Sequence, residues 1–306
     1  MTATFFIEQA LNGLQFGLML FLLAAGLTVV LGVMDTINLA HGSLYMIGAY
    51  LTAALVRATG SFAVAVLLAI LFTAGIGVAL EVTVFRVLYR RDHLSQVLAT
   101  FALILICNEV TRLLFGTQPL LLSLPAGLSG SLELLPGLPY PTYRLLIIGV
   151  GFAVAGLLYA VIAKTRPGMR VRAGASNREM ALVMGARIAP LFTVIFGLGA
   201  ALCAVAGALL GPLLAVQVGM GESVLILCFV VVIIGGVGSI RGALVGAILV
   251  GMVDTFGRVL LGMVLRQVLP PAIGVNVGPA LASMSIYILM AVVLCWRPQG
   301  LFPARG

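Results

Sequence analysis

Residues 11–34 read LNGLQFGLMLFLLAAGLTVVLGVM, and the chain continues as DTINLAHGS over residues 35–43. The first stretch holds 24 residues without an ionisable side chain. About 20 apolar residues are enough for a helix to cross the hydrocarbon core of a bilayer. Because lipid offers the backbone no hydrogen bonds, such a segment satisfies its own backbone groups as an α-helix. The stretch therefore predicts a transmembrane helix that ends at a polar break.

Further charge-free runs follow along the chain, over residues 61–80, 145–163, 191–221 and 267–296. Overall, 62% of the 306 residues are hydrophobic and 8% are charged, whereas a soluble domain carries about 25% charged residues. The runs are apolar on all sides, unlike the alternating strands of about ten residues in a membrane barrel. The sequence therefore predicts an all-α fold, a polytopic transmembrane helical bundle.

The apolar segments predict one transmembrane domain over residues 1–306. It is expected to have about eight to nine membrane segments, fewer full crossings if the short ones are interrupted or re-entrant helices. The expected segments lie near residues 11–34, 39–57, 61–85, 94–115, 144–163, 191–214, 223–238, 241–257 and 279–296. After the eighth segment, the stretch from Arg258 to Pro271 is expected to form an outer amphipathic connection.

Basic residues predict the orientation of the bundle. They gather within residues 86–91, 164–187 and 297–305, whereas the loop over residues 116–143 carries Glu133 and no basic residue. Loops rich in lysine and arginine stay on the cytoplasmic side. The N-terminus is therefore expected outside and the C-terminus inside. The net charge is +8. Because the basic residues gather in these loops, the charge is explained by membrane orientation and does not indicate nucleic-acid binding.

Two segments, Met34–Ser43 and Gly235–Gly242, interrupt the apolar helices. Non-helical backbone at membrane depth is tolerated where it is buried in protein or lines a cavity, and transporters use such breaks in their solute path. The alternative is that both are ordinary turns near the bilayer surface, because charged groups such as Arg241 require water or a partner. The candidate residues of the translocation path are Asn38, His41, Gly42, Ser43, Gly235, Gly236, Gly238 and Ser239.

Two further polar features can be interpreted from the residues next to them in the sequence. Glu109 and Arg112 are three residues apart, share a helix face and are predicted to form an ion pair. The basic loop over about residues 164–190 turns at Pro167-Gly168 and continues as an amphipathic helix along the inner surface. By its pattern alone, this helix fits a lipid surface and a docking site for a cytoplasmic partner equally well.

The sequence holds no enzyme motif. A phosphate-binding P-loop ends in Gly-Lys-Ser/Thr, but the only lysine, Lys164, follows Ala163. The four cysteines lie in apolar runs without metal-ligand spacing and are read as small buried side chains. No catalytic residue and no metal site are therefore expected. An intramembrane enzyme resting on His41 and Asp35 is a weaker alternative.

Several motifs together resemble a known family of permeases. The stretch GLTVVLGVMDTINLAHGSLYMIGAY over residues 26–50 resembles the signature of LivH-type branched-chain amino acid permeases. The inner loop resembles the family's EAA loop, because Glu179, Ala181 and Gly185 hold its spacing, while Met180 replaces the middle alanine. The Gly-rich segment 235–251 and the tail RPQGLF over residues 297–302 are also similar.

The resemblance implies the permease subunit of an ABC importer in the bacterial inner membrane. Such an importer takes branched-chain amino acids from a periplasmic binding protein, and this chain would pair with a second, homologous permease. Two cytoplasmic ATPase subunits would use ATP, whereas this chain would bind no cofactor. The ATPase-coupling residues implied are Arg170, Arg172, Glu179, Ala181 and Gly185. Permeases for urea, amides or other amino acids and an ion-coupled secondary transporter are the alternatives.

Overall fold

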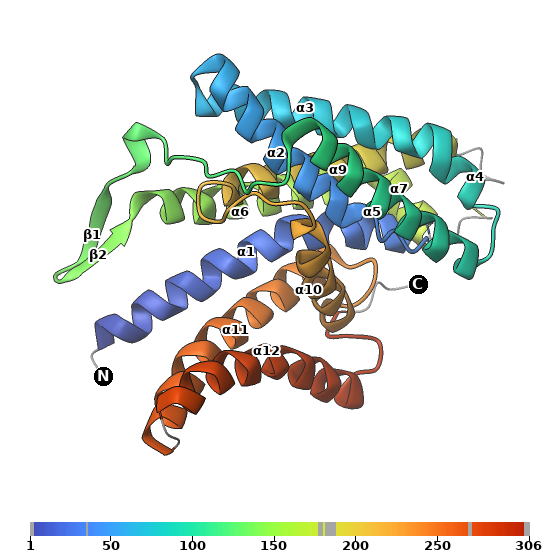
Figure 1. Ribbon diagram of the computed structural model, residues 1–306. Helices are drawn as coiled ribbons and strands as arrows, with labels where there is room; N and C mark the ends of the chain where they lie inside the picture. The colour runs from blue at the N-terminus through green and yellow to red at the C-terminus, as the bar shows by residue number, and fades with distance from the viewer. Residues whose placement is uncertain (1–2, 35, 177–179, 181–187, 269–270, 303–306) are drawn as a thin grey trace.

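The protein is described here by a computed structural model covering residues 3–34, 36–176, 180, 188–268 and 271–302 (Figure 1). Its helices are α1 (Ala3–Met34), α2 (His41–Thr59), α3 (Phe62–Leu80), α4 (Arg86–Leu88), α5 (His93–Phe115), α6 (Thr142–Lys164), α7 (Arg166–Ser176), α9 (Ile188–Leu210), α10 (Met220–Gly235), α11 (Ile240–Val268) and α12 (Pro271–Trp296). Shorter elements are the π-helix η1 (Glu81–Phe85), the 3-10 turn η2 (Ala126–Leu128) and the antiparallel strands β1 (Ser131–Leu135) and β2 (Leu138–Pro141).

Helix α1 is the central element, and its residues 18–30 are buried throughout. It packs against α6, α9, α10 and α11. Glycines permit the close crossings, because a Cβ atom at Gly17 would strike the backbone of α11 and one at Gly26 would lie 3.0 Å from Gly199 of α9. Small residues let helix backbones approach in membranes, where burying apolar surface gives no driving force between helices.

Helices α2 and α3 form a second layer on α9. Here too the contacts are between small residues. A Cβ atom at Gly48 of α2 would lie 2.5 Å from Ala204, and one at Gly77 of α3 would lie 2.5 Å from Ala200. On the other side of α1, α11 packs against both α1 and α12, and Figure 1 shows α11 and α12 below α1 in this view.

Six helices are long and apolar enough to cross a membrane, judged by length and composition over the described residues. Two shorter apolar stretches, α10 (Met220–Gly235) and residues Ala280–Trp296 of α12, accompany them. The prediction of a polytopic helical bundle is therefore confirmed, and the count of eight to nine segments stays a prediction. Figure 1 shows the β1–β2 hairpin and the start of α1 at one end of the bundle and α4 and α7 at the other.

Two details differ from the sequence-based expectation. The loop before α6 contains the small β1–β2 hairpin, which turns at Gly137 with a φ of 83°. The stretch after Arg258 is not a separate connection, because α11 runs without interruption to Val268. Its Arg258 binds Asp254 one turn earlier, so the arginine is neutralised within the helix and does not end it.

Candidate functional site

Helices α2 and α10 both begin inside the bundle. Their first residues meet where the backbone of Gly42 lies directly against that of Gly221, so that neither position has room for a side chain. Next to this contact, His41 packs against Gly199, the twelfth of the 23 residues of α9. The junction of α2 and α10 therefore lies near the middle of the membrane segment that α9 forms.

His41 is almost fully buried between α1 and α9. Its Nε2 lies 3.3 Å from the carbonyl oxygen of Leu23 and 3.1 Å from Sγ of Cys203. The ring thus fills the space that Gly26 and Gly199 leave at the crossing of α1 and α9. In this conformation His41 holds three helices together at the start of α2.

The other residues of the first break are also enclosed. Asn38 is fully buried, and its side-chain oxygen and nitrogen have no hydrogen-bond partner among the residues that the structure describes. Ser43 is buried and contacts the Cys107 thiol of α5. Asp35 lies outside the described residues. A buried amide without partners is costly, so Asn38 marks a place where a bound solute or water would supply hydrogen bonds.

The second break is a tight turn between α10 and α11. Gly236 and Gly238 adopt φ values of 102° and 80°, which favour glycine. Hydrogen bonds from Leu301 and Phe302 to the carbonyls of Ile234 and Gly235 fasten the C-terminal segment to it. The turn lies near the end of α6 that leads into α7, because neighbouring Arg241 binds Tyr159, five residues before the end of α6 at Lys164. Ser239 accepts from the backbone N–H of Gly242 and caps α11.

The two breaks thus lie at different depths. The first break and the start of α10 meet in the middle of the bundle, whereas the Gly235–Ser239 turn lies toward the end of the bundle where α6 leads into α7. The assignment of both sets of residues to the translocation path stays a prediction.

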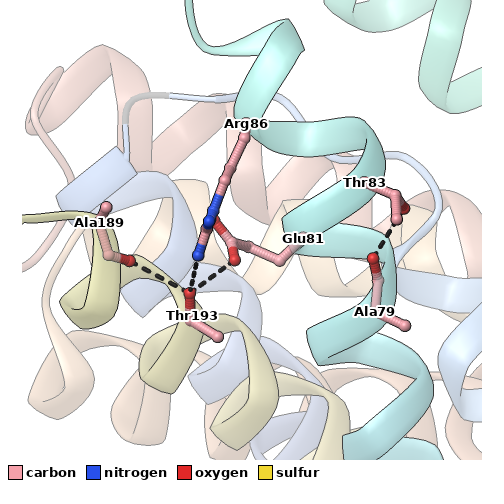
Figure 2. A network of polar contacts seen from close by, with 6 residues as sticks. All are labelled: Ala79, Glu81, Thr83, Arg86, Ala189 and Thr193. Atoms are coloured by element: carbon pink, nitrogen blue, oxygen red, sulfur yellow. Dashed lines mark hydrogen bonds and ion pairs between the residues drawn. The ribbon is translucent and has the colours of Figure 1, made fainter.

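A polar network joins η1, which continues α3, to α9 at the end of the bundle that carries α4 (Figure 2). Glu81 is fully buried in η1, and its Oε2 accepts a hydrogen bond of 2.7 Å from the Thr193 hydroxyl of α9. Arg86 lies 3.4 Å from the other Glu81 oxygen and also donates to Thr193 at 3.0 Å. In the π-helix the Arg86 N–H donates to the Glu81 carbonyl five residues earlier, which turns Glu81 inward.

The predicted coupling segment is described only in part. Arg170 and Arg172 lie on α7, which packs against α6, α1 and α9. Arg172 donates to the carbonyl of Ile162, so α7 folds back onto the end of α6. Glu179, Ala181 and Gly185 lie outside the described residues. The helix that follows the segment is α9, whose second turn carries Thr193.

The amino-acid sequence of the chain is similar to those of known proteins. The family model described as "Branched-chain amino acid transport system / permease component" matches residues 9–294. The chain belongs to this permease family. It is 28% identical to the high-affinity branched-chain amino acid transport system permease protein BraD of Pseudomonas aeruginosa, over 97% of this chain and 95% of that protein.

Other relatives of this permease have the same kind of name. The high-affinity branched-chain amino acid transport system permease protein LivH of Escherichia coli K12 is 27% identical over 86% of this chain and 90% of the relative. A probable LivH permease protein from Methanocaldococcus jannaschii is 28% identical over 78% and 76% of the two chains. No solved structure matches the chain. The resemblance seen in the sequence is thereby confirmed over most of the permease.

The permease also contains polar residues that sequence reasoning missed. Glu222, in the first turn of α10, accepts a hydrogen bond of 2.6 Å from the Asn108 amide of α5. The two residues are 114 positions apart, so no local spacing could pair them. The only available signal was a carboxylate just after Gly219-Met220-Gly221 in an otherwise apolar run.

Proposed function

We propose that this chain is the transmembrane permease subunit of an ABC importer in the inner membrane. It forms the path for branched-chain amino acids that a periplasmic binding protein delivers. The observation that carries this proposal is the family match over residues 9–294, together with relatives whose names specify the same transport system.

The energy for transport comes from partner subunits in this proposal. The chain carries no phosphate-binding motif, so two cytoplasmic ATPases hydrolyse ATP, and a second homologous permease completes the membrane part. The network at the inner end supports a mechanical link to such partners. Thr193 ties the start of α9 to Glu81 of η1, so a displacement of the loop before α9 is passed to α3.

The arrangement of charges argues against an ion-coupled transporter. Such a transporter would hold its ion with carboxylates grouped in the membrane. Glu81, Glu109 and Asp254 instead each form an ion pair with an arginine three to five residues along the chain. The carboxylate of Glu222 is hydrogen-bonded to the neutral Asn108 amide of α5.

Copurification and uptake test the proposal together. The tagged chain is extracted from its native membrane in mild detergent, and the accompanying proteins are identified by mass spectrometry. Two ATPase subunits and a second permease are expected. The complex, reconstituted in liposomes with its binding protein, is expected to take up leucine, isoleucine or valine when ATP is supplied. A chain that purifies alone, or as a homo-oligomer, while a known importer stays intact under the same conditions contradicts the proposal.

The coupling segment has its own test. Glu179→Ala and Gly185→Val are expected to lower uptake severely while the ATPase activity of the assembled complex persists. Met180→Ala is the matched control, because it restores the Glu-Ala-Ala pattern of the EAA loop and is expected to keep uptake. Uptake at the wild-type rate in both Glu179→Ala and Gly185→Val contradicts the assignment of the coupling segment.

A further inference from the structure

Glu222 lies at membrane depth. It follows Gly221, whose backbone rests on Gly42 near the middle of the bundle. Its partner Asn108 lies seven residues before the end of α5 at Phe115, which is about 10 Å inside that helix end at 1.5 Å per residue. The pair therefore lies inside the span of α5 and not in the outer loop.

Glu222 is also exposed in this single chain. Its side chain lies on an outward surface formed by α5 and α10, and Asn108 is half-buried beside it. In the described region it has a neutral amide as its hydrogen-bond partner. Glu109 and Arg112 extend the same polar surface toward the outer end of α5, with side chains 61% and 50% exposed.

An exposed carboxylate at this depth cannot face lipid at an acceptable cost, because a charge in the hydrocarbon core is strongly unfavourable. It requires water, a polar solute or a polar group of the second permease. A place on a water-accessible path satisfies this need, and it also suits the exposed Glu109–Arg112 pair on α5. The contact between Ser43 and Cys107, which precedes Asn108, connects this surface to the first break.

The chemistry of the surface identifies the kind of solute group that fits. Asn108 donates to one Glu222 oxygen, which leaves the second carboxylate oxygen and the Asn108 oxygen as acceptors. An ammonium group offers three donors and a positive charge. One helical turn toward the inside, Leu105 and Ile226 expose 51% and 53% of their surface, so an aliphatic side chain attached to that ammonium would meet apolar atoms.

We propose that Glu222 and Asn108 form a site in the translocation path that binds the ammonium group of the transported amino acid. Leu105 and Ile226 contact its aliphatic side chain. This inference rests on the proposed function, because it requires a zwitterionic substrate with an apolar side chain. The binding protein recognises the amino acid first, and the site formed by Glu222 and Asn108 contacts it a second time within the membrane.

Uptake by the complete importer in liposomes tests the role of the charge. Glu222→Gln is expected to reduce leucine uptake about tenfold or more, since a charge-assisted hydrogen bond is lost, and Glu222→Asp is expected to retain most of it. Glu109→Gln is the matched control, because Arg112, three residues before the end of α5 and 50% exposed, can extend its charge to water without this partner. This variant should take up leucine like the wild type. Normal uptake by Glu222→Gln overturns the proposal.

Chemical labelling tests the position without depending on transport. Glu222→Cys in the assembled complex is treated with a membrane-impermeant, positively charged methanethiosulfonate, and labelled peptides are quantified by mass spectrometry. Labelling is expected to approach that of Ser123→Cys in the exposed outer loop and to exceed that of Leu71→Cys, which is exposed on the apolar surface of α3. Labelling no faster than Leu71→Cys overturns the proposal.

The two experiments separate this inference from the proposed function. If the wild-type complex takes up no branched-chain amino acid, the proposed function fails, and the ammonium site fails with it. If the wild type takes up leucine while Glu222→Gln is unaffected or Glu222→Cys stays unlabelled, only the ammonium site fails.

Discussion

At the scale of single residues, three carboxylates of the permease, Glu81, Glu109 and Asp254, pair with an arginine on the same helical stretch. Arg258 contacts Asp254 at 2.8 Å, and Arg112 contacts Glu109 at 3.1 Å. Both pairs have helical spacing, so each is formed as soon as its helix forms. A paired charge costs far less in a membrane than an isolated one.

The Asp254–Arg258 pair gives a test of this principle. Asp254 is 8% exposed and Arg258 is 52% exposed. Arg258→Met leaves a buried carboxylate without its partner and is expected to destabilise the detergent-solubilised protein by about 1–3 kcal/mol, less than for a fully buried pair. The double variant Asp254→Leu/Arg258→Met is expected to recover most of the thermal unfolding midpoint. A double variant no more stable than Arg258→Met contradicts this account.

Thr193 gives a second test at this scale. Thr193→Val removes the hydroxyl that Glu81 accepts from, and is expected to cost about 1–3 kcal/mol because the buried carboxylate loses a partner. Thr83→Val is the matched control, since the Thr83 hydroxyl donates only to the Ala79 carbonyl of its own helix (Figure 2). The thermal unfolding midpoints of the two variants are measured in the same detergent. Equal midpoints contradict a stabilising role for the contact between Thr193 and Glu81.

The sequence predicted one of the local side-chain pairs, and it did not predict the Asp254–Arg258 pair, which also has helical spacing. The Glu109–Arg112 pair was expected from its spacing and is present. The contacts of Glu81 with Thr193 and of Asn108 with Glu222 join residues 112 and 114 positions apart. They depend on which helices become neighbours, and the periodicity of a single segment carries no such information.

At the scale of elements, the defining feature is the meeting of α2 and α10 at their first residues. Gly42→Ala or Gly221→Ala places a methyl group into the backbone of the opposite helix. Each is expected to lower the amount of folded protein and its uptake by more than tenfold, since backbone cannot move aside cheaply.

Gly149→Ala on α6 is the control for these two variants. A Cβ atom at Gly149 meets nothing within 4 Å, so this variant should accumulate and transport like the wild type. Size-exclusion profiles and uptake measured side by side provide the comparison. A Gly221→Ala variant that behaves like Gly149→Ala contradicts the close contact.

The breaks before α2 and α10 were not equally predictable from the sequence. The break before α2 was visible because Asp35, Asn38 and His41 interrupt an apolar run. The break before α10 lies inside the charge-free run of residues 191–221, where the structure ends α9 at Leu210 and begins α10 at Met220. Gly211, Pro212 and Gly219 were the local signals, and the expected segments near residues 191–214 and 223–238 already left a gap there. The sequence did not show that α10 begins inside the bundle against α2, because that contact joins residues far apart in the chain.

At the scale of the whole molecule, the arginines of residues 86–91 and of α7 lie at the end of the bundle opposite the β1–β2 hairpin (Figure 1). By the positive-inside rule, this arginine-rich end is expected on the cytoplasmic side and the hairpin on the outer side. Alkaline phosphatase fused after Gly137 is expected to be active, and the same enzyme fused after Arg91 inactive. Green fluorescent protein at these two positions should show the opposite pattern. Activity of both enzyme fusions contradicts the predicted orientation.

The central position of α1 has a consequence for how the protein is made. Helix α1 leaves the ribosome before the other helices described here and packs against α9, α10 and α11, which follow much later in the chain. Between Met34 and the start of α11 at Ile240 lie about two hundred residues, which take roughly 10–40 s to synthesise at 5–20 residues per second. During that time α1 sits in the membrane with its glycine-lined face uncovered. The newly made chain therefore needs the insertion machinery, or a chaperone within the bilayer, to shield this face until the later helices arrive.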